Sequence, residues 1–307
     1  MSEETFRDRL YDLPRLLDLR AALRRVSDPR EPRAELVSGA NPSRAARPGV
    51  LPGSFNPLTT AHTGLAEAAL ANGSVDVLLF ALSTHTVDKE VVTGAALEDR
   101  LLVLQLYAER DQRLGVLLLN RGLYVDQAAL IRMVIADVQT VVFVVGFDKI
   151  VQIFDPHYYD DRDAALERLF SIATFLVAPR GAGGAEQLAE LLTRAENRHF
   201  ASAVRLLDVP PELSDIGSSQ VRQAIQAGQL PGGQLPPEAQ ALVEETGAYA
   251  ARGPEEGGVD RYRLRLALLD ALEVTLGPAA GADTFRELYR KALAEPGPLG
   301  PRQPGPP

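Results

Sequence analysis

Between residues 50 and 209 the sequence alternates short apolar runs with stretches of helical periodicity, and this alternation constrains the fold more than any other feature. The apolar runs are continuous, which is typical of parallel strands buried on both faces. They predict strands over residues 50–51, 75–82, 115–119, 140–145, 173–177 and 203–209. The stretches between them predict helices over residues 63–71, 95–110, 126–136, 160–170 and 185–195. We therefore expect an α/β fold, a doubly wound and mostly parallel sheet with right-handed crossovers.

The first 48 residues differ from this alternating core. Apolar side chains recur there at helical spacing, and from Ser27 the sequence becomes rich in Pro, Arg and Ala. We expect an N-terminal helical extension over residues 1–48, interrupted or restarted at Pro14, which ends in a linker from residue 27 to residue 48. The apolar stripe of this extension needs cover, either from the main domain or from another subunit.

The C-terminal part, residues 253–307, is also distinct. Helical patterns occupy residues 259–276 and 282–294, and the remaining tail consists mostly of Pro and Gly. A tail of that composition does not bury enough apolar surface to fold, so we expect it to be disordered. Residues 49–252 are then expected to form the core domain between two extensions.

Composition limits the kinds of partner. The chain has 307 residues, of which 41 are acidic and 32 basic, and its net charge is −9. An acidic surface argues against general nucleic-acid binding. The absence of cysteine excludes disulfides and thiolate zinc sites, and no apolar run is long enough to span a bilayer. We expect a cytoplasmic protein whose partners are small molecules, not nucleic acid or membrane, and the apolar terminal helices leave a homo-oligomer open.

The segment from Gly53 to His62 places a glycine turn between an apolar strand and an Ala/Leu-rich helix. In a parallel sheet, ligands bind beyond the carboxyl ends of the strands, where this turn lies. Free N–H groups at a helix N-terminus attract anions, and a glycine lets the backbone approach a ligand closely. The imidazole of His62 can donate a hydrogen bond to a phosphate oxygen. The alternative is an ordinary Asn–Pro turn that binds nothing.

A second anion-binding candidate enters the helix expected over residues 219–227. Ser218 and Ser219 are N-cap candidates, with hydroxyl groups near free N–H groups. Arg222 follows one turn later, so its guanidinium can point back toward the same anion. Together these groups suit a polyphosphate. The alternative is a Ser-capped helix with a solvated arginine.

A third candidate is Gly146-Phe147-Asp148, which ends the strongly apolar run 141–145. A carboxylate at the carboxyl end of a strand can hold a ribose hydroxyl, by analogy with dinucleotide-binding folds. The alternative is that Asp148 caps the helix that follows it. From this segment alone the capping interpretation is favoured at least as much as the ribose interpretation.

Other conspicuous polar residues favour structural roles. Tyr158 and Tyr159 follow a proline turn and are expected to pack rather than to bind. Arg100 lies in the helix expected over residues 95–110, where an ion pair is the alternative to a ligand contact. His85 lies in a loop that could approach a substrate, although a structural role is favoured there too.

Taken in order, these segments resemble the nucleotidylyltransferase superfamily, in particular the nicotinamide and nicotinate mononucleotide adenylyltransferases. Gly53-Ser54-Phe55-Asn56-Pro57, with Thr59 and His62, is similar to the family's GSFNP and T/H-x-x-H signature. The segment from Ile216 to Arg222 is similar to its ISSTxxR signature. Gly146 to Asp148 is similar to its G-x-D segment, and residues 177–181 are similar to a strand end that carries an arginine. Gly217 and Ser219 replace a serine and a threonine of the second signature. The resemblance spans residues 50–250 and implies the family's Rossmann-like fold.

The resemblance implies transfer of an adenylyl group from ATP to the phosphate of a pyridine mononucleotide, with release of pyrophosphate, in NAD biosynthesis. The nucleophile is already anionic, so catalysis requires positioning and charge stabilisation rather than a strong base. The implied catalytic residues are His62 at the α-phosphate, Arg222 at the β- and γ-phosphates, and Lys89 as a further phosphate partner. For Lys89 the alternative is a solvated loop lysine. Mg²⁺ is the implied cofactor, held mainly by the substrate phosphates.

The same resemblance implies the substrate-binding residues. The glycine turn would seat the phosphate of the mononucleotide, and Tyr124 resembles a residue near the family's nicotinate-binding region. The residues expected to bind substrate are Gly53, Ser54, Phe55, Asn56, Thr59, Tyr124, Gly146, Asp148, Arg180, Ser218 and Ser219.

Tryptophan is absent from the sequence, although the family often stacks the pyridine ring on this residue. Stacking on an aromatic side chain is worth about 1–3 kcal/mol per base, so a different acceptor stays open. The alternatives are a phosphopantetheine-like, sugar or alcohol phosphate as acceptor, with CTP possible in place of ATP. A non-catalytic nucleotide-binding regulator on the same fold is a further alternative, because the two extensions lie outside the signatures.

Overall fold

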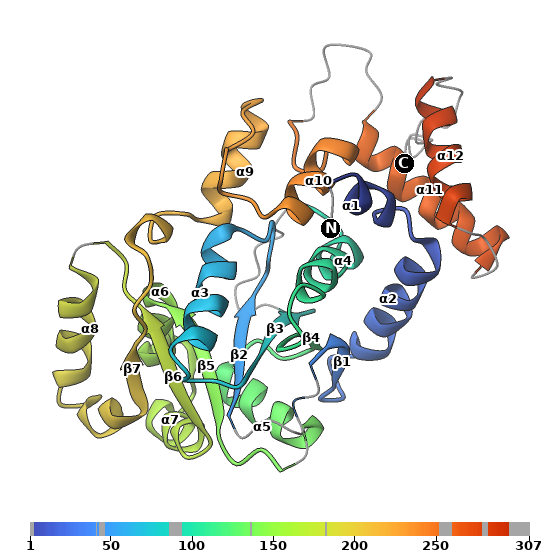
Figure 1. Ribbon diagram of the computed structural model, residues 1–307. Coiled ribbons are helices and arrows are strands. Elements are labelled where there is room, and N and C mark those ends of the chain that lie inside the picture. Colours follow the sequence, from blue (N-terminus) through green and yellow to red (C-terminus); the bar gives the residue numbers. More distant parts are fainter. Residues whose placement is uncertain are drawn as a thin grey trace, which may run out of the picture.

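The structure is a computed structural model that describes residues 3–40, 42, 47–85, 94–135, 137–181, 183–251, 260–277 and 282–294. Its centre is a seven-stranded sheet in the order β1-β4-β3-β2-β5-β6-β7 (Figure 1). The strands are β1 (Ala34–Gly39), β2 (Pro48–Gly53), β3 (Val77–Ser83), β4 (Leu114–Leu119), β5 (Val141–Gly146), β6 (Ala173–Ala178) and β7 (Val204–Leu206). Strand β1 is antiparallel to β4, and the other neighbouring pairs are parallel. The expected doubly wound α/β fold is confirmed.

The direction in which strands are added reverses between β2 and β5. From β2 the chain adds β3 and β4 on one side, then returns to add β5, β6 and β7 on the other. Strands β2 and β5 are therefore neighbours, with Val50 paired to Phe143. Gly53 ends β2 and Gly146 ends β5, so the two glycine turns emerge side by side. This is the switch point at which open α/β sheets bind their ligands.

Both faces of the sheet are covered, as the continuous apolar runs predicted. Along β3, Leu78, Phe80 and Leu82 belong to one core cluster, whereas Leu79 and Ala81 belong to the other. Successive side chains of a strand point to opposite faces, so a run without polar residues is required when both faces are buried.

Helices cover the two faces unequally. The first cluster takes side chains from α1 (Glu3–Arg9), α2 (Leu13–Val26), α3 (Thr60–Ala71), α4 (Leu97–Ala108), α9 (Ser218–Gln226), α10 (Pro237–Thr246), α11 (Arg261–Thr275) and α12 (Ala282–Ala294). The second takes them from α5 (Tyr124–Val134), α6 (Phe147–Phe154), α7 (Arg162–Phe170) and α8 (Gly184–Thr193). Short 3₁₀ helices are η2 (Pro156–Tyr158), η3 (Arg198–Ala203) and η4 (Pro211–Leu213). Within the described ranges, no helix is both long and apolar enough to cross a bilayer.

Part of the expected linker is a strand. Residues 34–39 form β1, which pairs with β4 and contains an irregular register between Leu36 and Ser38. The preceding helix does restart near Pro14, because α2 begins at Leu13 and Asp12 accepts a hydrogen bond from the N–H of Arg15 at 3.2 Å. The strand state of β1 is set by its partner, since the segment has little β-type sequence pattern of its own.

The two terminal extensions pack against each other (Figure 1). Tyr11 lies between α1 and α2, and its ring is 5.5 Å from the rings of both Phe285 and Tyr289 on α12. All three rings are buried in the first core cluster. The apolar stripe of the N-terminal extension is thus covered within the chain. The expected disordered tail, residues 295–307, lies outside the described residues.

Candidate active site

Two pockets open at the carboxyl edge of the sheet, where β2 and β5 lie side by side. The larger pocket has a volume of about 610 Å³ and the smaller one about 320 Å³. The residues shared by their linings are Pro52, Gly53, Ser54, Lys149, Arg180 and Gly217. The pockets therefore meet over the turn that follows β2.

His62 lies in the first turn of α3 and lines the smaller pocket. Its Nδ1 atom accepts a hydrogen bond from the backbone N–H of Thr59 at 3.1 Å, and the Thr59 hydroxyl lies 2.8 Å away. An N–H group can only donate, so Nδ1 carries no proton and the neutral ring is assigned its proton on Nε2. Nε2 has no partner among the described residues. Burial lowers the pKa of His62 to about 4, so the ring is a neutral donor at pH 7.

The turn after β2, residues 53–57, has a strained conformation. Phe55 has a φ of +44°, in the left-handed region that non-glycine residues rarely adopt. Its buried ring makes edge-to-face contacts with His62 and Phe80, at centroid distances of 5.2 and 5.7 Å. A Cβ on Gly53 would lie 2.9 Å from the Phe55 ring. Glycine is therefore required here by the packing of Phe55, which is a reason different from the expected close approach of a ligand.

Two arginines hold carbonyl groups of this turn. Nη1 of Arg222 donates to the carbonyl of Asn56 at 2.5 Å, and Nη1 of Arg100 donates to the carbonyl of Ser54 at 3.4 Å. Arg100 also donates from Nε to the carbonyl of Ala95 at 2.7 Å. Neither guanidinium has a carboxylate partner in the part of the chain that the structure describes, so no ion pair of Arg100 is seen there. Burial is the main cause that lowers the pKa of Arg100.

Helix α9 begins at Ser218 with Gly217 as its N-cap, so the expected capping by Ser218 or Ser219 is wrong. The hydroxyl of Ser218 instead donates to the carbonyl of Pro57 at 2.9 Å. The hydroxyl of Ser219 accepts a hydrogen bond from Nη2 of Arg222 at 3.0 Å. Gly217, Ser218, Ser219 and Arg222 all line the larger pocket, where a helix N-terminus, hydroxyl groups and a guanidinium are available to an anion.

The turn after β5 is open by comparison. A Cβ added to Gly146 would meet nothing within 4 Å. Asp148 lies in the first turn of α6 and forms an ion pair with Arg180, which follows β6. Their side chains are 66% and 52% exposed. Both residues line the smaller pocket, so a ligand there would meet this pair directly.

The lining of the larger pocket includes aromatic side chains. Tyr124 begins α5, and its ring packs edge-on against Phe143 at 5.1 Å. Tyr124 lines the pocket together with Tyr158 and Tyr159, which sequence analysis expected to be structural. His85 lines it as well. A chain without tryptophan therefore still offers several aromatic rings to a planar ligand.

Three residues expected to bind substrate lie beneath the pockets. Phe55, Asn56 and Thr59 are buried, and neither pocket lining includes them. Oδ1 of Asn56 accepts a hydrogen bond from the N–H of Ala95 at 3.3 Å. In this structure the three residues shape the turn and the start of α3. Lys89 lies outside the described residues.

Lys149 is a site residue that sequence analysis missed. It lines both pockets, and its Nζ donates to Oε1 of Gln152 at 2.9 Å. Its position directly after Asp148 was the signal that could have identified it. Arg100 was noticed in the sequence, but its contact with Ser54 joins segments 46 residues apart and depends on the fold.

These features define a class of protein, the α/β proteins with a ligand site at the switch point of the sheet. In this chain the starts of α3 and α9 and several basic side chains surround the glycine turn at that point. The chain matches the cytidylyltransferase-like family model over residues 50–224 and belongs to that family. The resemblance to the nucleotidylyltransferase superfamily is thereby confirmed.

Two similar solved structures are both of the nicotinic acid mononucleotide adenylyltransferase of Plasmodium falciparum. The structure complexed with APC is 14% identical, has a TM-score of 0.45, and its alignment covers 65% of this chain and 95% of that one. The structure complexed with NaAD is also 14% identical, with a TM-score of 0.46 and coverages of 64% and 95%. A search of the curated proteins found no match.

Proposed function

We propose that this protein is an adenylyltransferase that transfers AMP from ATP to the phosphate of nicotinate or nicotinamide mononucleotide, releasing pyrophosphate, as a step of NAD biosynthesis. The observation that carries the proposal is that the glycine turn lines both pockets, with His62 in the lining of the smaller pocket and the start of α9 in that of the larger. Two adjoining pockets suit two nucleotides that must meet at their phosphates. The sequence signatures supply the choice of adenylyl group and acceptor.

In the proposed reaction, a phosphate oxygen of the mononucleotide attacks the α-phosphorus of ATP in line with the bridging oxygen. One P–O bond forms, one breaks, and the electron pair of the broken bond leaves with pyrophosphate. The attacking oxygen is already anionic, so no proton has to be removed from it. The protein would act by positioning the phosphates and by stabilising the charge that develops between them.

His62 suits the transferring phosphate because its neutral ring has a free Nε2–H group. This group would donate a hydrogen bond to a non-bridging oxygen of the α-phosphate. A bound anion would also raise the pKa of His62 from its value of about 4 and strengthen the hydrogen bond. The ring is held in orientation by its own Nδ1 bond to Thr59.

The remaining groups would divide between the two nucleotides. Arg222, Ser218 and Ser219 suit the β- and γ-phosphates in the larger pocket, next to the free N–H groups of α9. Asp148 suits a ribose hydroxyl in the smaller pocket. Tyr124 suits the pyridine ring in the larger pocket.

Mg²⁺ is proposed as part of the ATP substrate. No group of three His, Asp or Glu residues in the described part of the chain is placed to hold a metal. The described linings of both pockets contain a single carboxylate, that of Asp148. This donor set fits a cation carried by phosphates and water, whose contribution would be to neutralise phosphate charge. The chain would bind that complex through N–H groups, hydroxyls and cations.

A pyrophosphate-release assay on the full chain tests the proposal. ATP or CTP with Mg²⁺ would be combined with nicotinate mononucleotide, nicotinamide mononucleotide, phosphopantetheine or a sugar phosphate. We expect release with ATP and a pyridine mononucleotide, together with the dinucleotide product by mass spectrometry. The variant His62→Ala should lose this activity, whereas His199→Ala, in η3 before the distant β7, should keep it.

The other outcomes have separate meanings. Release with CTP, or with another acceptor, would retain nucleotidyl transfer and overturn the proposed substrates. Tight nucleotide binding without release of pyrophosphate in any combination would overturn the proposal that the protein is an enzyme, and would support a nucleotide-binding regulator.

A further inference from the structure

The segment 94–100, which leads into α4, packs tightly on the glycine turn. The N–H of Ala95 donates to the buried Asn56 side chain, and Arg100 reaches the carbonyl of Ser54. A Cβ on Gly94 would lie 2.1 Å from Oδ1 of Asn56, so there is no space between the two segments. The conformation of the turn therefore depends on where the start of α4 lies.

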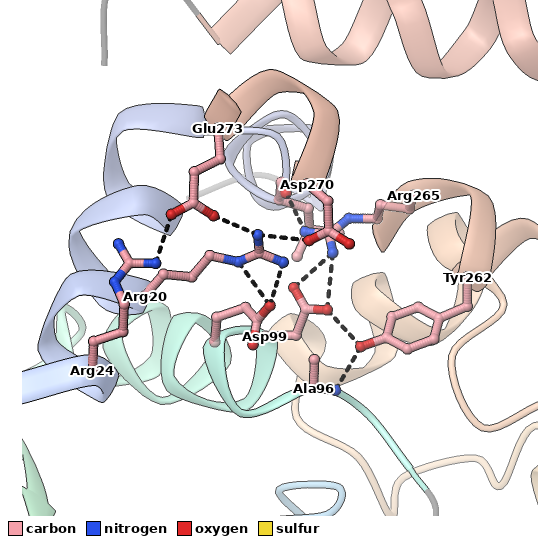
Figure 2. Close-up of polar contacts among 10 residues, drawn as sticks. Arg20, Arg24, Ala96, Asp99, Tyr262, Arg265, Asp270 and Glu273 are labelled. Carbon is pink, nitrogen blue, oxygen red and sulfur yellow. Dashed lines mark hydrogen bonds and ion pairs between the residues drawn. The ribbon is translucent and has the colours of Figure 1, made fainter. Parts of the chain in front are cut away.

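Helix α11 holds the same segment from its other side. The hydroxyl of Tyr262 accepts the N–H of Ala96 at 2.7 Å and donates to Oδ2 of Asp99 at 2.6 Å. Nη1 of Arg265 bonds both carboxylate oxygens of Asp99, at 2.7 and 2.9 Å. Asp99 and Arg265 are both 0% exposed. Figure 2 shows these contacts among Ala96, Asp99, Tyr262 and Arg265. The first turn of α4 is thus fixed by two side chains of the C-terminal extension.

The network supplies one backbone contact at the start of α4, the N–H of Ala96 that the Tyr262 hydroxyl accepts. Ala96 is the N-cap residue of α4, and its side chain has no group that could bond the free N–H groups of the first turn. Nη2 of Arg265 also donates to the carbonyl of Leu10 at 2.8 Å, which joins the network to the N-terminal extension. A buried ion pair is often no more stabilising than apolar side chains of equal volume, so stability alone is a weak reason for this one.

We propose that Tyr262 and Arg265 are positioning residues of the active site. Through Ala96 and Asp99 they fix the start of α4, and this start holds the glycine turn through Ala95 and Arg100. The inference rests on the proposed function, because nucleotidyl transfer is the activity that the turn would serve. Helix α11 lies beyond the family match at residues 50–224, so the C-terminal extension becomes part of the framework of the site.

A matched pair of variants separates positioning from stability. Tyr262→Phe removes the hydroxyl that contacts α4. Tyr289→Phe removes the hydroxyl of another buried tyrosine of the same extension, which donates to the carbonyl of Arg261 at 3.2 Å. We expect Tyr262→Phe to lower kcat roughly tenfold, since a displacement of about 1 Å in a reacting group can lower the rate ~10²-fold. Tyr289→Phe also loses a hydrogen bond of a buried tyrosine but should keep the wild-type kcat.

A second pair uses the buried charges. Arg265→Met leaves the Asp99 carboxylate buried without its partner, and we expect a lower kcat together with a lower unfolding temperature. Adding Asp99→Asn to Arg265→Met removes the stranded charge and keeps an acceptor for Tyr262. The double variant should recover kcat toward the wild-type value. A double variant that folds but is no more active than Arg265→Met would overturn the proposal.

Hydrogen exchange supplies a readout that does not depend on activity. In Tyr262→Phe, amides of residues 53–60 and 94–100 should exchange roughly two- to tenfold faster, the change that loss of one hydrogen bond produces in an opening equilibrium. In Tyr289→Phe these amides should be unchanged. Equal exchange in both variants would overturn the positioning role even for an active enzyme. If the wild-type protein transfers no nucleotide, the proposed function fails, and exchange still decides whether α11 positions the turn.

Discussion

The two glycine turns at the centre of the sheet lie side by side and are built in opposite ways. In the turn after β2, Phe55 is 1% exposed, and Arg100, Arg222 and Ser218 bond the backbone carbonyls around it. The turn after β5 carries an exposed ion pair and open space at Gly146. The difference indicates that the turn after β2 is fixed before any ligand binds, whereas the groups of the turn after β5 are exposed to solvent. We call the turn at residues 53–57 with His62 the rigid half of the site, and the turn at residues 146–148 with Arg180 the open half.

The energies of the two turns support this view. A left-handed φ at a non-glycine residue such as Phe55 costs about 1–3 kcal/mol and persists only where surrounding contacts determine it. An exposed ion pair such as Asp148–Arg180 contributes about 0–1 kcal/mol. The backbone strain of the turn after β2 is offset by the contacts of its neighbours. The turn after β5 has no such strain, and its ion pair contributes little to stability.

The largest expected effect is on the rigid half. His62→Ala should lower kcat by ~10²–10³-fold, because one preorganised donor to the transition state is lost. The affinity for ATP, measured by calorimetry, should change far less. A variant with wild-type turnover would show that the rigid turn does not contribute its imidazole to the reaction.

Next in size are the two glycines themselves. Gly53→Ala should destabilise the protein by about 1–3 kcal/mol, because the new Cβ would meet the buried Phe55 ring. Gly146→Ala has space for its Cβ and should leave the unfolding free energy nearly unchanged. Urea denaturation of both variants measures the contrast directly. Equal losses of stability would contradict the difference between the two turns.

His62 also makes the stability of the rigid half depend on pH. Its pKa is about 4 in the folded protein, below the value of 6.5 for an unperturbed imidazole. Between these values the unfolded chain binds a proton that the folded chain does not. This contribution to stability is therefore present above about pH 6.5 and is lost as the pH falls toward 4. Thermal unfolding from pH 7 to pH 4 should show a shallower decline in His62→Gln than in wild type, while His157→Gln, an exposed control, should follow wild type.

The smallest effect is expected at the open turn. A double-mutant cycle with Asp148→Asn and Arg180→Gln should give a coupling energy of at most about 1 kcal/mol in thermal unfolding. The same variants should weaken nucleotide binding if the two side chains contact the substrate. A coupling of several kcal/mol would mean that the open half is as firmly built as the rigid half.

The parts of the fold that local sequence patterns encode could be predicted. Continuous apolar runs located β3, β5 and β6 because both faces of the sheet are covered. Strand β1 was missed because residues 34–39 lie in a Pro/Arg-rich stretch and become a strand only by pairing with β4. Helix α6 was not among the expected helices, although a helix after Asp148 was the alternative interpretation of that segment.

The candidate site divides in the same way. The glycine turn, His62 and the α9 segment could be identified from order and spacing. The positive φ of Phe55 and the contact from Arg222 to Asn56 could not, since the latter joins residues 166 positions apart. The Ser218 hydroxyl shows the same limit: its spacing fitted a helix cap, yet its partner is the carbonyl of Pro57.

Strand β1 covers the edge of a strand whose six residues are all buried, Leu114–Leu119. Without β1, a wholly apolar row with unpaired N–H and C=O groups would face solvent and act as a template for a second chain. A fragment trimmed to residues 50–224 would contain the whole family match but not β1, and we expect it to aggregate. Expression of a shortened protein should therefore keep residues 34–39, because solubility depends on a segment that takes no part in the chemistry.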